Sequence, residues 1–273
     1  MKVGISGLGF VGNAIYKCLI NKGIEVVIYD KYKEGGIGSF KSLIDCDIIY
    51  IALPTYYNEK LKDYDTNAIN ETMDLLKKSY FKGTVLLKST VTPGKVDSLS
   101  LEYNLNIVHN PEFLTARSAE QDFENQKHIV LGRSDNCTKN AFNLALQFYK
   151  EYFPAATISE CTAKEAESMK LFLNSFYATK VQFFNEIYQL SNTIGIDYDK
   201  VKNLMLRNGW INPMHTNVPG PDGQLSYGGL CFPKDTLALL NYMQEHNTSH
   251  DVLKAVINER DKMRKDKDYI IKY

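Results

Sequence analysis

Residues 2–30 constrain the fold more than any other part of this 273-residue chain. The stretch begins with a short apolar run, KVGIS, and continues with GLGFVG, whose glycines have the spacing G-x-G-x-x-G. Apolar residues at helical spacing follow, and a second β-branched run, IEVVIYD, ends at Asp30. This order predicts a strand, a tight glycine turn, a helix and a second strand.

The three glycines match a dinucleotide-binding turn. Gly7 permits the tight turn, Gly9 lets the backbone approach a pyrophosphate, and Gly12 lets the helix pack closely on the strand. The phosphates would then lie at a helix N-terminus, where free N–H groups favour negative charge. The residues interleaved with the glycines belong to the same predicted cofactor site: Leu8, Phe10 and Val11.

Asp30 indicates which dinucleotide the turn binds. A carboxylate at the end of the second strand can accept hydrogen bonds from the adenosine ribose. It favours NAD over NADP, because a 2′-phosphate would meet a negative charge. Lys31 and Lys33 weaken this preference, and flavin is the alternative cofactor.

The first half of the chain alternates between strand and helix patterns. The apolar runs CDIIYIALP, GTVLLKST, LNIVHNP and KHIVLG each end in turn formers or polar residues, and helical stretches such as TNAINETMDLLKKSY separate several of them. The alternation predicts an α/β fold, with a doubly wound parallel sheet covered by helices on both faces. We assign residues 1–157 to a Rossmann-like NAD-binding domain.

Composition excludes several classes of protein. Hydrophobic residues make up 44% and charged residues 23%, which is typical of a globular chain. Lys+Arg and Asp+Glu both total 32, so no net charge attracts nucleic acid or an anionic membrane, and no apolar run is long enough to span a bilayer. The five cysteines include no C-x-x-C pair, which argues against a disulfide framework or metal site and favours the cytoplasm.

A long helical pattern opens the second half, over residues 162–195. Thr162 and Glu165 have the spacing of a capping box, and Gly195 can end the helix. Such a length predicts a helix that bridges domains or packs against a partner subunit. Because the helix is apolar over more of its circumference than one small domain could cover, we expect a homodimer. Residues 158–273 are expected to form this central helix and a smaller helical domain for substrate binding and dimerisation.

Several polar residues are candidates for catalysis. Lys170 and Asn174 are spaced i, i+4 among apolar neighbours, and the alternative is a solvated pair. Glu112 and Thr90 follow predicted strands, where α/β sheets bind ligands. The alternatives are an acid at a helix N-terminus for Glu112 and a turn or cap residue for Thr90. Cys231 lies in YGGLCFPKDT among turn formers and ions, which packing alone does not explain.

These motifs resemble those of the UDP-glucose 6-dehydrogenases and related nucleotide-sugar dehydrogenases. GLGFVG, KSTVTPG, NPEFL, KLFLN, FNEI and GGLCFPKD occur in the family's order across residues 3–260. The resemblance implies that two NAD molecules oxidise a sugar alcohol to a carboxylate and that one water is consumed. It makes Cys231 the nucleophile that captures the intermediate aldehyde and then carries a thioester.

The resemblance also implies roles for the other candidates. Lys170 would stabilise oxyanions, with Asn174 beside it, and Glu112 would be the base for thioester hydrolysis. A water would be held by Asp235 and Thr90. Lys234 would favour the thiolate form of the cysteine. The cofactor site would include Thr55, Thr90 and Lys234 in addition to the glycine turn. The substrate site would comprise Glu112, Phe113, Leu114, Lys170, Asn174, His215, Tyr227, Gly228, Gly229 and Cys231.

The chain departs from the family pattern in two places. Many relatives carry a second glutamate where this chain has Ala116, so that contact is missing or comes from elsewhere, as from Arg117. Relatives also continue into a third domain that holds uridine diphosphate, whereas this sequence ends at Tyr273. We therefore expect a short form, and we expect the loop over residues 207–229, with Trp210 and His215, to supply part of the nucleotide grip.

Three alternatives stay open from the sequence. The substrate is UDP-glucose, or else GDP-mannose or a UDP-N-acetylhexosamine. A catalytically idle NAD-binding protein would have no use for the full set of candidate residues. A two-electron hydroxyacid dehydrogenase shares the predicted plan but does not need Cys231.

Overall fold

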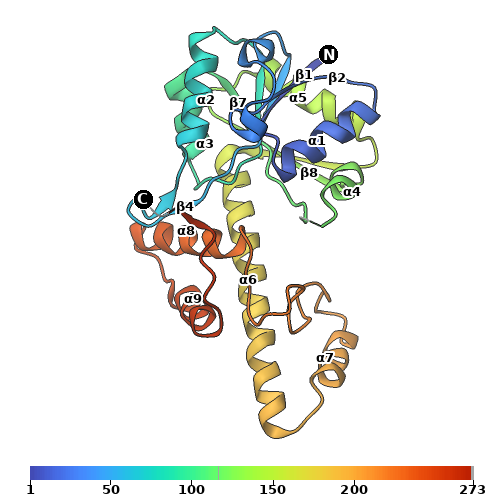
Figure 1. Cartoon of the computed structure of the whole chain (residues 1–273), viewed down its shortest axis with the longest axis vertical. Coiled ribbons are helices and arrows are strands. Elements are labelled where there is room, and N and C mark those ends of the chain that lie inside the picture. Colours follow the sequence, from blue (N-terminus) through green and yellow to red (C-terminus); the bar gives the residue numbers. More distant parts are fainter. Residues whose placement is uncertain (116, 272–273) are drawn as a thin grey trace. The chain divides into compact units, whose positions relative to one another are not determined.

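The computed structural model describes residues 1–115 and 117–271, which form two compact units (Figure 1). Unit 1 comprises Met1–Thr55 and Asp65–Lys170, and unit 2 comprises Tyr56–Tyr64 and Leu171–Tyr273. The division falls inside the long helix, after Lys170, whereas the sequence suggested a boundary before that helix. The short segment Tyr56–Tyr64 lies within the first half of the chain but belongs to unit 2.

Unit 1 is built on a seven-stranded sheet with the order β2-β1-β3-β6-β7-β8-β9. Strand β1 lies between β2 and β3, and both pairings are parallel, so the chain reverses its winding direction at the end of β1. This confirms the doubly wound fold and places the glycine turn at the topological switch point. The strands are β1 (Lys2–Ser6), β2 (Glu25–Tyr29), β3 (Ile48–Ile51), β6 (Thr84–Leu87), β7 (Asn106–His109), β8 (His128–Arg133) and β9 (Thr157–Thr162).

The sheet is not parallel throughout. Strand β8 runs antiparallel to β7, and β9 then pairs in parallel with β8. The sequence predicted a parallel sheet, and the β7–β8 pairing departs from it, because the periodicity of a strand carries no information about its direction. Among the described residues between β7 and β8, the one helix is the short α4 (Ala119–Glu124), which packs beside α1. The sequence reading also missed β9, whose largely exposed residues lack an apolar run.

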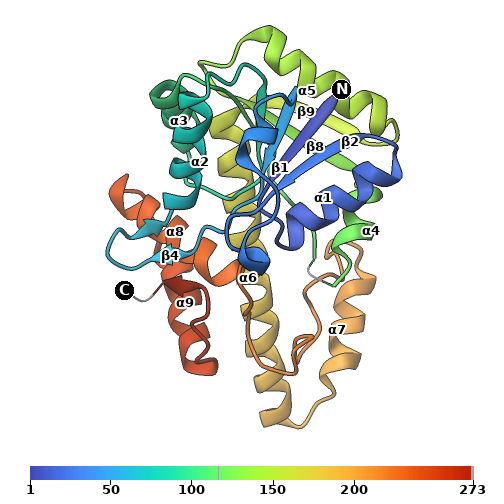
Figure 2. The ribbon, with the colours of Figure 1, turned by 45° about the horizontal axis from the view of Figure 1, so that its top comes forward.

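Helices cover both faces of the sheet, as Figures 1 and 2 show. Side chains of β3 alternate between two cores: Ile48 and Tyr50 join one, and Ile49 and Ile51 join the other. The first core includes α1 (Phe10–Asn21), α4 and α5 (Lys139–Tyr152), and the second includes η2 (Phe40–Leu43), α2 (Asn67–Lys78) and α3 (Lys95–Tyr103). A further 3-10 turn, η1 (Lys33–Gly35), follows β2.

Unit 2 is mainly helical. Its core packs Tyr57 and Tyr64 against Leu171, Leu239 and Leu253, which come from three different helices. A three-stranded sheet with the order β10-β4-β5 ties the segment Tyr56–Tyr64 to the far end of the described chain. Its elements are β4 (Tyr57–Asn58), β5 (Asp63–Tyr64), α6 (Ala163–Ile194, shared with unit 1), α7 (Tyr198–Arg207), α8 (Phe232–Glu245), α9 (Asp251–Met263) and β10 (Ile270–Ile271). None of the described helices is long and apolar enough to cross a membrane.

The ends of α6 lie where the sequence predicted them. Glu165 Oε2 accepts hydrogen bonds from the Thr162 backbone N–H and hydroxyl, both at 2.8 Å, and the Glu165 N–H donates to Thr162 Oγ1 at 3.2 Å. This reciprocal pattern is the predicted capping box. Gly195 follows the last turn with φ +72°, a conformation that glycine adopts without strain.

A buried carboxylate, Glu167, joins α6 to the start of α3 within unit 1. Its two oxygens accept hydrogen bonds from the backbone N–H groups of Gly94 at 2.6 Å and Val96 at 2.7 Å. These donors belong to the first turn of α3, where the helix supplies no partner of its own. Because Glu167 is fully buried, desolvation raises its pKa to about 7 despite the two donors.

We expect Glu167 to make the stability of the protein depend on pH. A carboxyl group whose pKa is raised by folding contributes stability that is present below about pH 4.5 and lost as pH rises through about 7. Glu167→Gln removes this titration, so the wild type should lose up to about 3 kcal/mol relative to the variant over that range. Urea unfolding midpoints of both proteins between pH 4.5 and pH 8 measure the difference, and a constant difference would contradict the assignment.

Candidate active site

The glycine turn of unit 1 has the geometry that a dinucleotide requires. Gly7 has φ +94°, and a Cβ on it would lie 2.5 Å from the Ala52 carbonyl oxygen. A Cβ on Gly12 would lie 1.8 Å from the Gly7 carbonyl oxygen, so only glycine allows α1 to begin so close to β1. A Cβ on Gly9 would meet no atom within 4 Å, which leaves the approach to the N-terminus of α1 open. The turn therefore fits a pyrophosphate group.

Asp30 stabilises this turn and leaves acceptor capacity for a ribose. Its Oδ2 accepts from the Leu8 N–H at 2.8 Å, and its Oδ1 accepts from the N–H groups of Tyr32 at 3.0 Å and Lys33 at 2.9 Å. Although partial burial opposes the effect, these backbone donors hold the pKa of Asp30 below its ordinary value. Oδ2 has one donor in this network, so a hydroxyl group can donate to it as well.

Both neighbouring lysines have partners within the protein. Lys31 forms an ion pair with Glu71, and Lys33 Nζ donates to the Leu8 carbonyl oxygen at 2.9 Å. Of the other residues assigned to the turn, Phe10 is 67% exposed and Val11 is half-buried. Thr55 is buried, and its hydroxyl donates to the Thr90 carbonyl oxygen at 2.9 Å. This bond links the loops that follow β3 and β6, where the sequence placed the cofactor site.

Glu112 lies just after β7, at the carboxyl edge of the sheet. Its Oε1 accepts from the backbone N–H groups of Phe113 at 2.7 Å and Leu114 at 3.2 Å. Its Oε2 lies 2.9 Å from Nζ of Lys88, a residue whose side chain is 2% exposed. The carboxylate is therefore held on both oxygens, and Lys88, which follows β6, is a residue that the sequence reading missed.

Lys88 is itself part of a buried chain of polar groups. Its Nζ donates to Asn110 Oδ1 at 3.1 Å, and the same oxygen accepts a hydrogen bond from the Tyr149 hydroxyl. Tyr50 donates to the Tyr149 hydroxyl at 2.9 Å, so the chain runs from the core of unit 1 to Glu112. Buried hydrogen bonds of this kind fix the orientation of the groups that make them.

Lys170, the last residue of unit 1, reaches the same loop. Its Nζ donates to the Glu112 carbonyl oxygen and lies 5.0 Å from the centre of the Phe113 ring. The side chain is largely buried, which excludes the simple solvated lysine that the sequence left as an alternative. Burial, with the charges of Lys88 and Lys170, lowers the pKa of nearby His109 to about 3, so this imidazole is neutral near pH 7.

Within unit 2, Cys231 immediately precedes α8. It is the one exposed cysteine of the described chain; Cys18, Cys46 and Cys137 are buried, and Cys161 is half-buried. Gly229 has φ +75° with open space around its Cα. At Gly228 that space is filled, because a Cβ there would lie 2.1 Å from Nη2 of Arg264. Gly229 therefore meets a backbone requirement, whereas Gly228 leaves room for the side chain of Arg264.

Asp235, one turn after Cys231 in α8, is the centre of a second buried cluster. Its Oδ1 accepts from the Tyr64 hydroxyl at 2.6 Å and from Lys234 Nζ at 2.7 Å, and its Oδ2 accepts from Asn174 Nδ2 at 2.6 Å. Burial and the charge of Asp235 raise the pKa of Tyr64 well above its ordinary value, so Tyr64 acts as a donor. The charge of Lys234 is paired with Asp235, and no sequence signal pointed to Tyr64.

The remaining predicted residues lie as follows. His215 has φ +67° and contacts the rings of Tyr177 at 4.8 Å and Phe232 at 5.4 Å between centroids. Tyr227 is 2% exposed, so its ring is part of the interior of unit 2 and not a free stacking surface. Trp210 is 91% exposed and Arg117 is also exposed, while Ala116 lies outside the described residues.

Comparisons with known proteins identify the family. Models of the UDP-glucose/GDP-mannose dehydrogenase family match residues 36–152, for its NAD binding domain, and residues 164–261, for its central domain. The chain belongs to the UDP-glucose/GDP-mannose dehydrogenase family. The resemblance seen in the sequence is thereby confirmed, as are the Rossmann-like fold and NAD as the cofactor.

Three relatives show how far the similarity extends. The UDP-glucose 6-dehydrogenase of Campylobacter jejuni subsp. jejuni is 30% identical over 97% of this chain and 73% of its own length. The GDP-mannose 6-dehydrogenase of Pseudomonas aeruginosa is 25% identical over 94% of this chain and 67% of its own length. The structure of a UDP-glucose dehydrogenase from Pyrobaculum islandicum superposes with a TM-score of 0.83 at 24% identity. The match covers 96% of this chain and 68% of that chain.

The geometry of Asp30 predicts the effect of a single substitution. Asp30→Asn keeps one acceptor for the turn but removes the negative charge, and a hydrogen bond to a charged group contributes about 1.5–3 kcal/mol. The variant should bind NADH roughly tenfold to a hundredfold more weakly and discriminate less against NADPH. Calorimetric titration measures the affinities for NADH and NADPH. The control is Asp45→Asn, which makes the same change in charge at an exposed position. Unchanged NADH affinity in Asp30→Asn would exclude Asp30 from the ribose site.

Proposed function

We propose that this family member catalyses the four-electron oxidation of UDP-glucose to UDP-glucuronate, with Cys231 as the covalent nucleophile. The observation that carries the proposal is the exposed Cys231 thiol at the start of α8, one turn from the buried cluster of Asp235, Asn174 and Lys234. The relatives named for UDP-glucose support this substrate over the GDP-mannose relative, which is less similar, at 25% against 30% identity.

The chemistry requires a thiol at one step. Loss of a proton from the C6 hydroxyl and of a hydride from C6 gives an aldehyde, and the Cys231 thiolate adds to it to form a thiohemiacetal. Loss of a second hydride gives a thioester on Cys231. Water then adds to the thioester and expels the thiolate, which leaves the carboxylate product. NAD supplies the hydride acceptor in each oxidation, so two molecules are reduced per sugar.

The residues of the two units have distinct roles in this sequence of steps. The ammonium group of Lys170 stabilises the oxyanions, and Asn174 adds a neutral donor. Asp235 and Thr90 hold a water that takes the proton of the alcohol, and Glu112 acts as base for the water that hydrolyses the thioester. The ion pair with Lys88 and the two backbone donors support the assignment of Glu112, because they fix the orientation of its carboxylate.

Two substitutions separate the covalent step from the hydrolytic step. Cys231→Ser should abolish turnover and leave NADH binding unchanged, because a serine hydroxyl is a poorer nucleophile and its ester is hydrolysed less readily. Glu112→Gln should allow capture and both hydride losses but slow hydrolysis by about 10²–10⁴-fold. Intact mass spectrometry of Glu112→Gln with NAD and UDP-glucose should then show a nucleotide-sugar acyl adduct.

Peptide mapping places the adduct, which should be on Cys231. The exposed Glu120→Gln serves as the control for loss of a carboxylate, and it should turn over normally without an adduct. Near-normal turnover by Cys231→Ser would exclude the covalent mechanism. Normal turnover by Glu112→Gln without an adduct would exclude only the assignment of the base.

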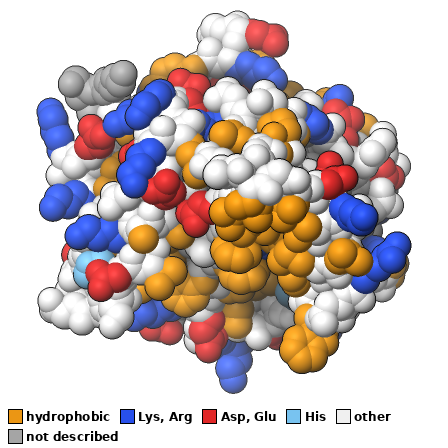
Figure 3. Space-filling view, turned by 90° about the horizontal axis from the view of Figure 1, so that it is seen from below, with side chains coloured by type: hydrophobic (Ala, Val, Ile, Leu, Met, Phe, Trp, Pro, Cys, Tyr) orange, Lys and Arg blue, Asp and Glu red, His pale blue; other side chains and the backbone are white. Residues whose placement is uncertain are grey.

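We also propose that the protein is a homodimer that uses α6. Five large hydrophobic side chains of α6, each more than half exposed, recur at steps of four and seven residues: Phe172, Phe176, Phe183, Leu190 and Ile194. This spacing places them along one stripe of the helix, which is typical of helix pairing. Figure 3 shows hydrophobic side chains gathered on one face of the molecule. A stripe of this length on a single exposed helix supports a second copy of the chain as its partner.

Light scattering tests the dimer. The wild type at micromolar concentration should have twice the chain mass of 31.1 kDa. The double variant Phe183→Asp/Leu190→Asp should be a monomer, because pairing would bury unpaired carboxylates. Leu101→Asp, at a 74% exposed position on α3, is the matched control and should stay dimeric. A monomeric wild type would contradict the proposal.

A further inference from the structure

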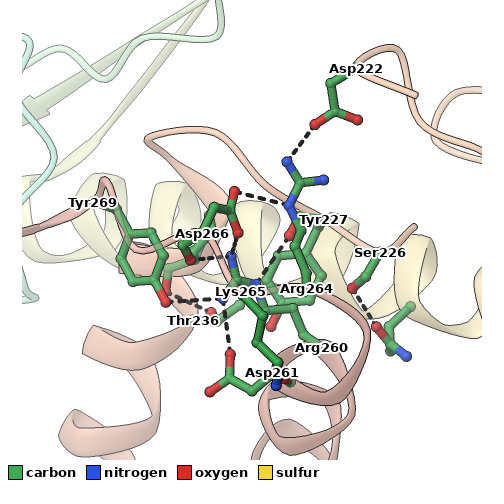
Figure 4. Close-up of polar contacts among 12 residues, drawn as sticks. Asp222, Ser226, Tyr227, Thr236, Arg260, Asp261, Arg264, Lys265, Asp266 and Tyr269 are labelled. Carbon is green, nitrogen blue, oxygen red and sulfur yellow. Dashed lines mark hydrogen bonds and ion pairs between the residues drawn. The ribbon is translucent and has the colours of Figure 1, made fainter. Parts of the chain in front are cut away.

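The loop that leads to Cys231 is held by two buried arginines from the C-terminal part of unit 2 (Figure 4). Arg260 belongs to the last turn of α9, and Arg264 directly follows that helix. Both side chains are almost fully buried, with relative exposures of 1% and 5%. Neither arginine belongs to the set of catalytic candidates, so their burial beside this loop calls for an explanation.

Arg264 contacts the loop at two points. Its Nη2 forms an ion pair with Asp222, and its guanidinium fills the space next to Gly228, where a Cβ would lie 2.2 Å from Cζ. Any side chain at position 228 would therefore displace the arginine. Arg264 Nε donates to Asp266 Oδ2 at 2.9 Å, which fixes the plane of the guanidinium.

Arg260 holds the backbone of Tyr227, the residue before Gly228. Its Nε donates to the Tyr227 carbonyl oxygen at 3.3 Å, and its guanidinium lies 5.9 Å from the centre of the Tyr227 ring. Its other nitrogens donate to Asp261 Oδ1 at 2.9 Å, to the Tyr269 hydroxyl at 3.2 Å and to the carbonyl and carboxylate oxygens of Asp266. Asp266 thus binds both arginines, one with each carboxylate oxygen.

Ser226, the residue before Tyr227, is fixed to α6. The Ser226 N–H donates to Asn185 Oδ1 at 2.8 Å, and its hydroxyl donates to Gln182 Oε1 at 2.6 Å. Residues 226–228 are therefore held by two helices and by the segment after α9. The next residue, Gly229, takes a left-handed conformation, and Cys231 follows two positions later at the start of α8.

Stability alone explains this network poorly. Burying two guanidinium groups carries a desolvation penalty, and the carboxylates that bind them stay partly exposed, so solvent screens the attraction that would offset it. What such a network does provide is a single geometry, because planar arginine forks bind carboxylates in fixed orientations. The backbone that it fixes is the one that carries the exposed thiol.

We propose that Arg264 and Arg260 are positioning residues for Cys231: they hold the backbone of residues 222–228 so that the thiol takes one position at the start of α8. This inference rests on the proposed function, in which Cys231 must meet an aldehyde carbon. Misplacement of a reacting group by about 1 Å can lower the rate about a hundredfold.

Three variants test the positioning role. Arg264→Gln removes the fork, Gly228→Ala displaces the guanidinium while leaving it in the chain, and Arg264→Lys retains only the charge. Turnover with UDP-glucose should fall by about tenfold to a hundredfold in the first two and less in the third, while the Kd for NADH stays unchanged. Lys265→Gln, an adjacent exposed lysine that bonds only to the Asp261 carbonyl oxygen among the described contacts, is the control and should behave as the wild type.

Two further readouts separate positioning from a general loss of structure. Amide hydrogen exchange should accelerate over residues 222–231 in Arg264→Gln but not in α6 beyond Gln182, and combining it with Gly228→Ala should add little to either single effect. Faster exchange with unchanged turnover would overturn the inference and leave the proposed function intact. Unchanged hydrogen exchange in Arg264→Gln would also overturn the inference.

A failure of the proposed function is recognisable separately. If the wild type oxidises no nucleotide sugar, the positioning of Cys231 is decided by its alkylation rate with iodoacetamide, which needs no catalysis. That rate should differ by about tenfold between the wild type and Arg264→Gln, and not between the wild type and Lys265→Gln. Equal rates in all three proteins would overturn the inference.

Discussion

The close backbone contact between Gly7 and Gly12 is the constraint on which unit 1 depends. With no Cβ on Gly12, α1 begins against the end of β1, directly at the point where the sheet changes its winding direction. A Cβ on Gly9 would meet no atom within 4 Å, so the N-terminus of α1, where the helix leaves N–H groups free, is open on that side. Asp30 then bonds to the Leu8 N–H and fixes the same turn from β2. The cofactor site is thus a consequence of how closely one helix meets one strand.

The two units prepare their candidate catalytic residues by different means. In unit 1 the carboxyl ends of parallel strands bring residues together, so that Lys88 after β6 meets Asn110 and Glu112 after β7. In unit 2 side-chain networks do this. Asp235 is held by Tyr64 and Asn174, and the loop before Cys231 is held by Arg260 at the end of α9 and by Arg264 just after it.

Local signals in the sequence predicted the features that local chemistry determines. The glycine spacing, the Thr162–Glu165 capping box and the stop at Gly195 each depend on residues within a few positions of one another, and the structure confirms them. The direction of β8 and the partner of Asp235 depend on residues far apart in the chain. Tyr64, 171 positions from Asp235, carries no motif, so only the fold reveals the pair.

The number of NADH molecules formed per sugar consumed tests the central claim most directly. The account predicts two NADH per UDP-glucose, with UDP-glucuronate as the product, because thiol capture at Cys231 commits the aldehyde to a second oxidation. The measurement is made with purified protein, excess NAD and a panel of UDP- and GDP-sugars. A ratio of one for every sugar that reacts would contradict the covalent mechanism, and no NADH from any sugar would contradict the assignment of this chain as a nucleotide-sugar dehydrogenase.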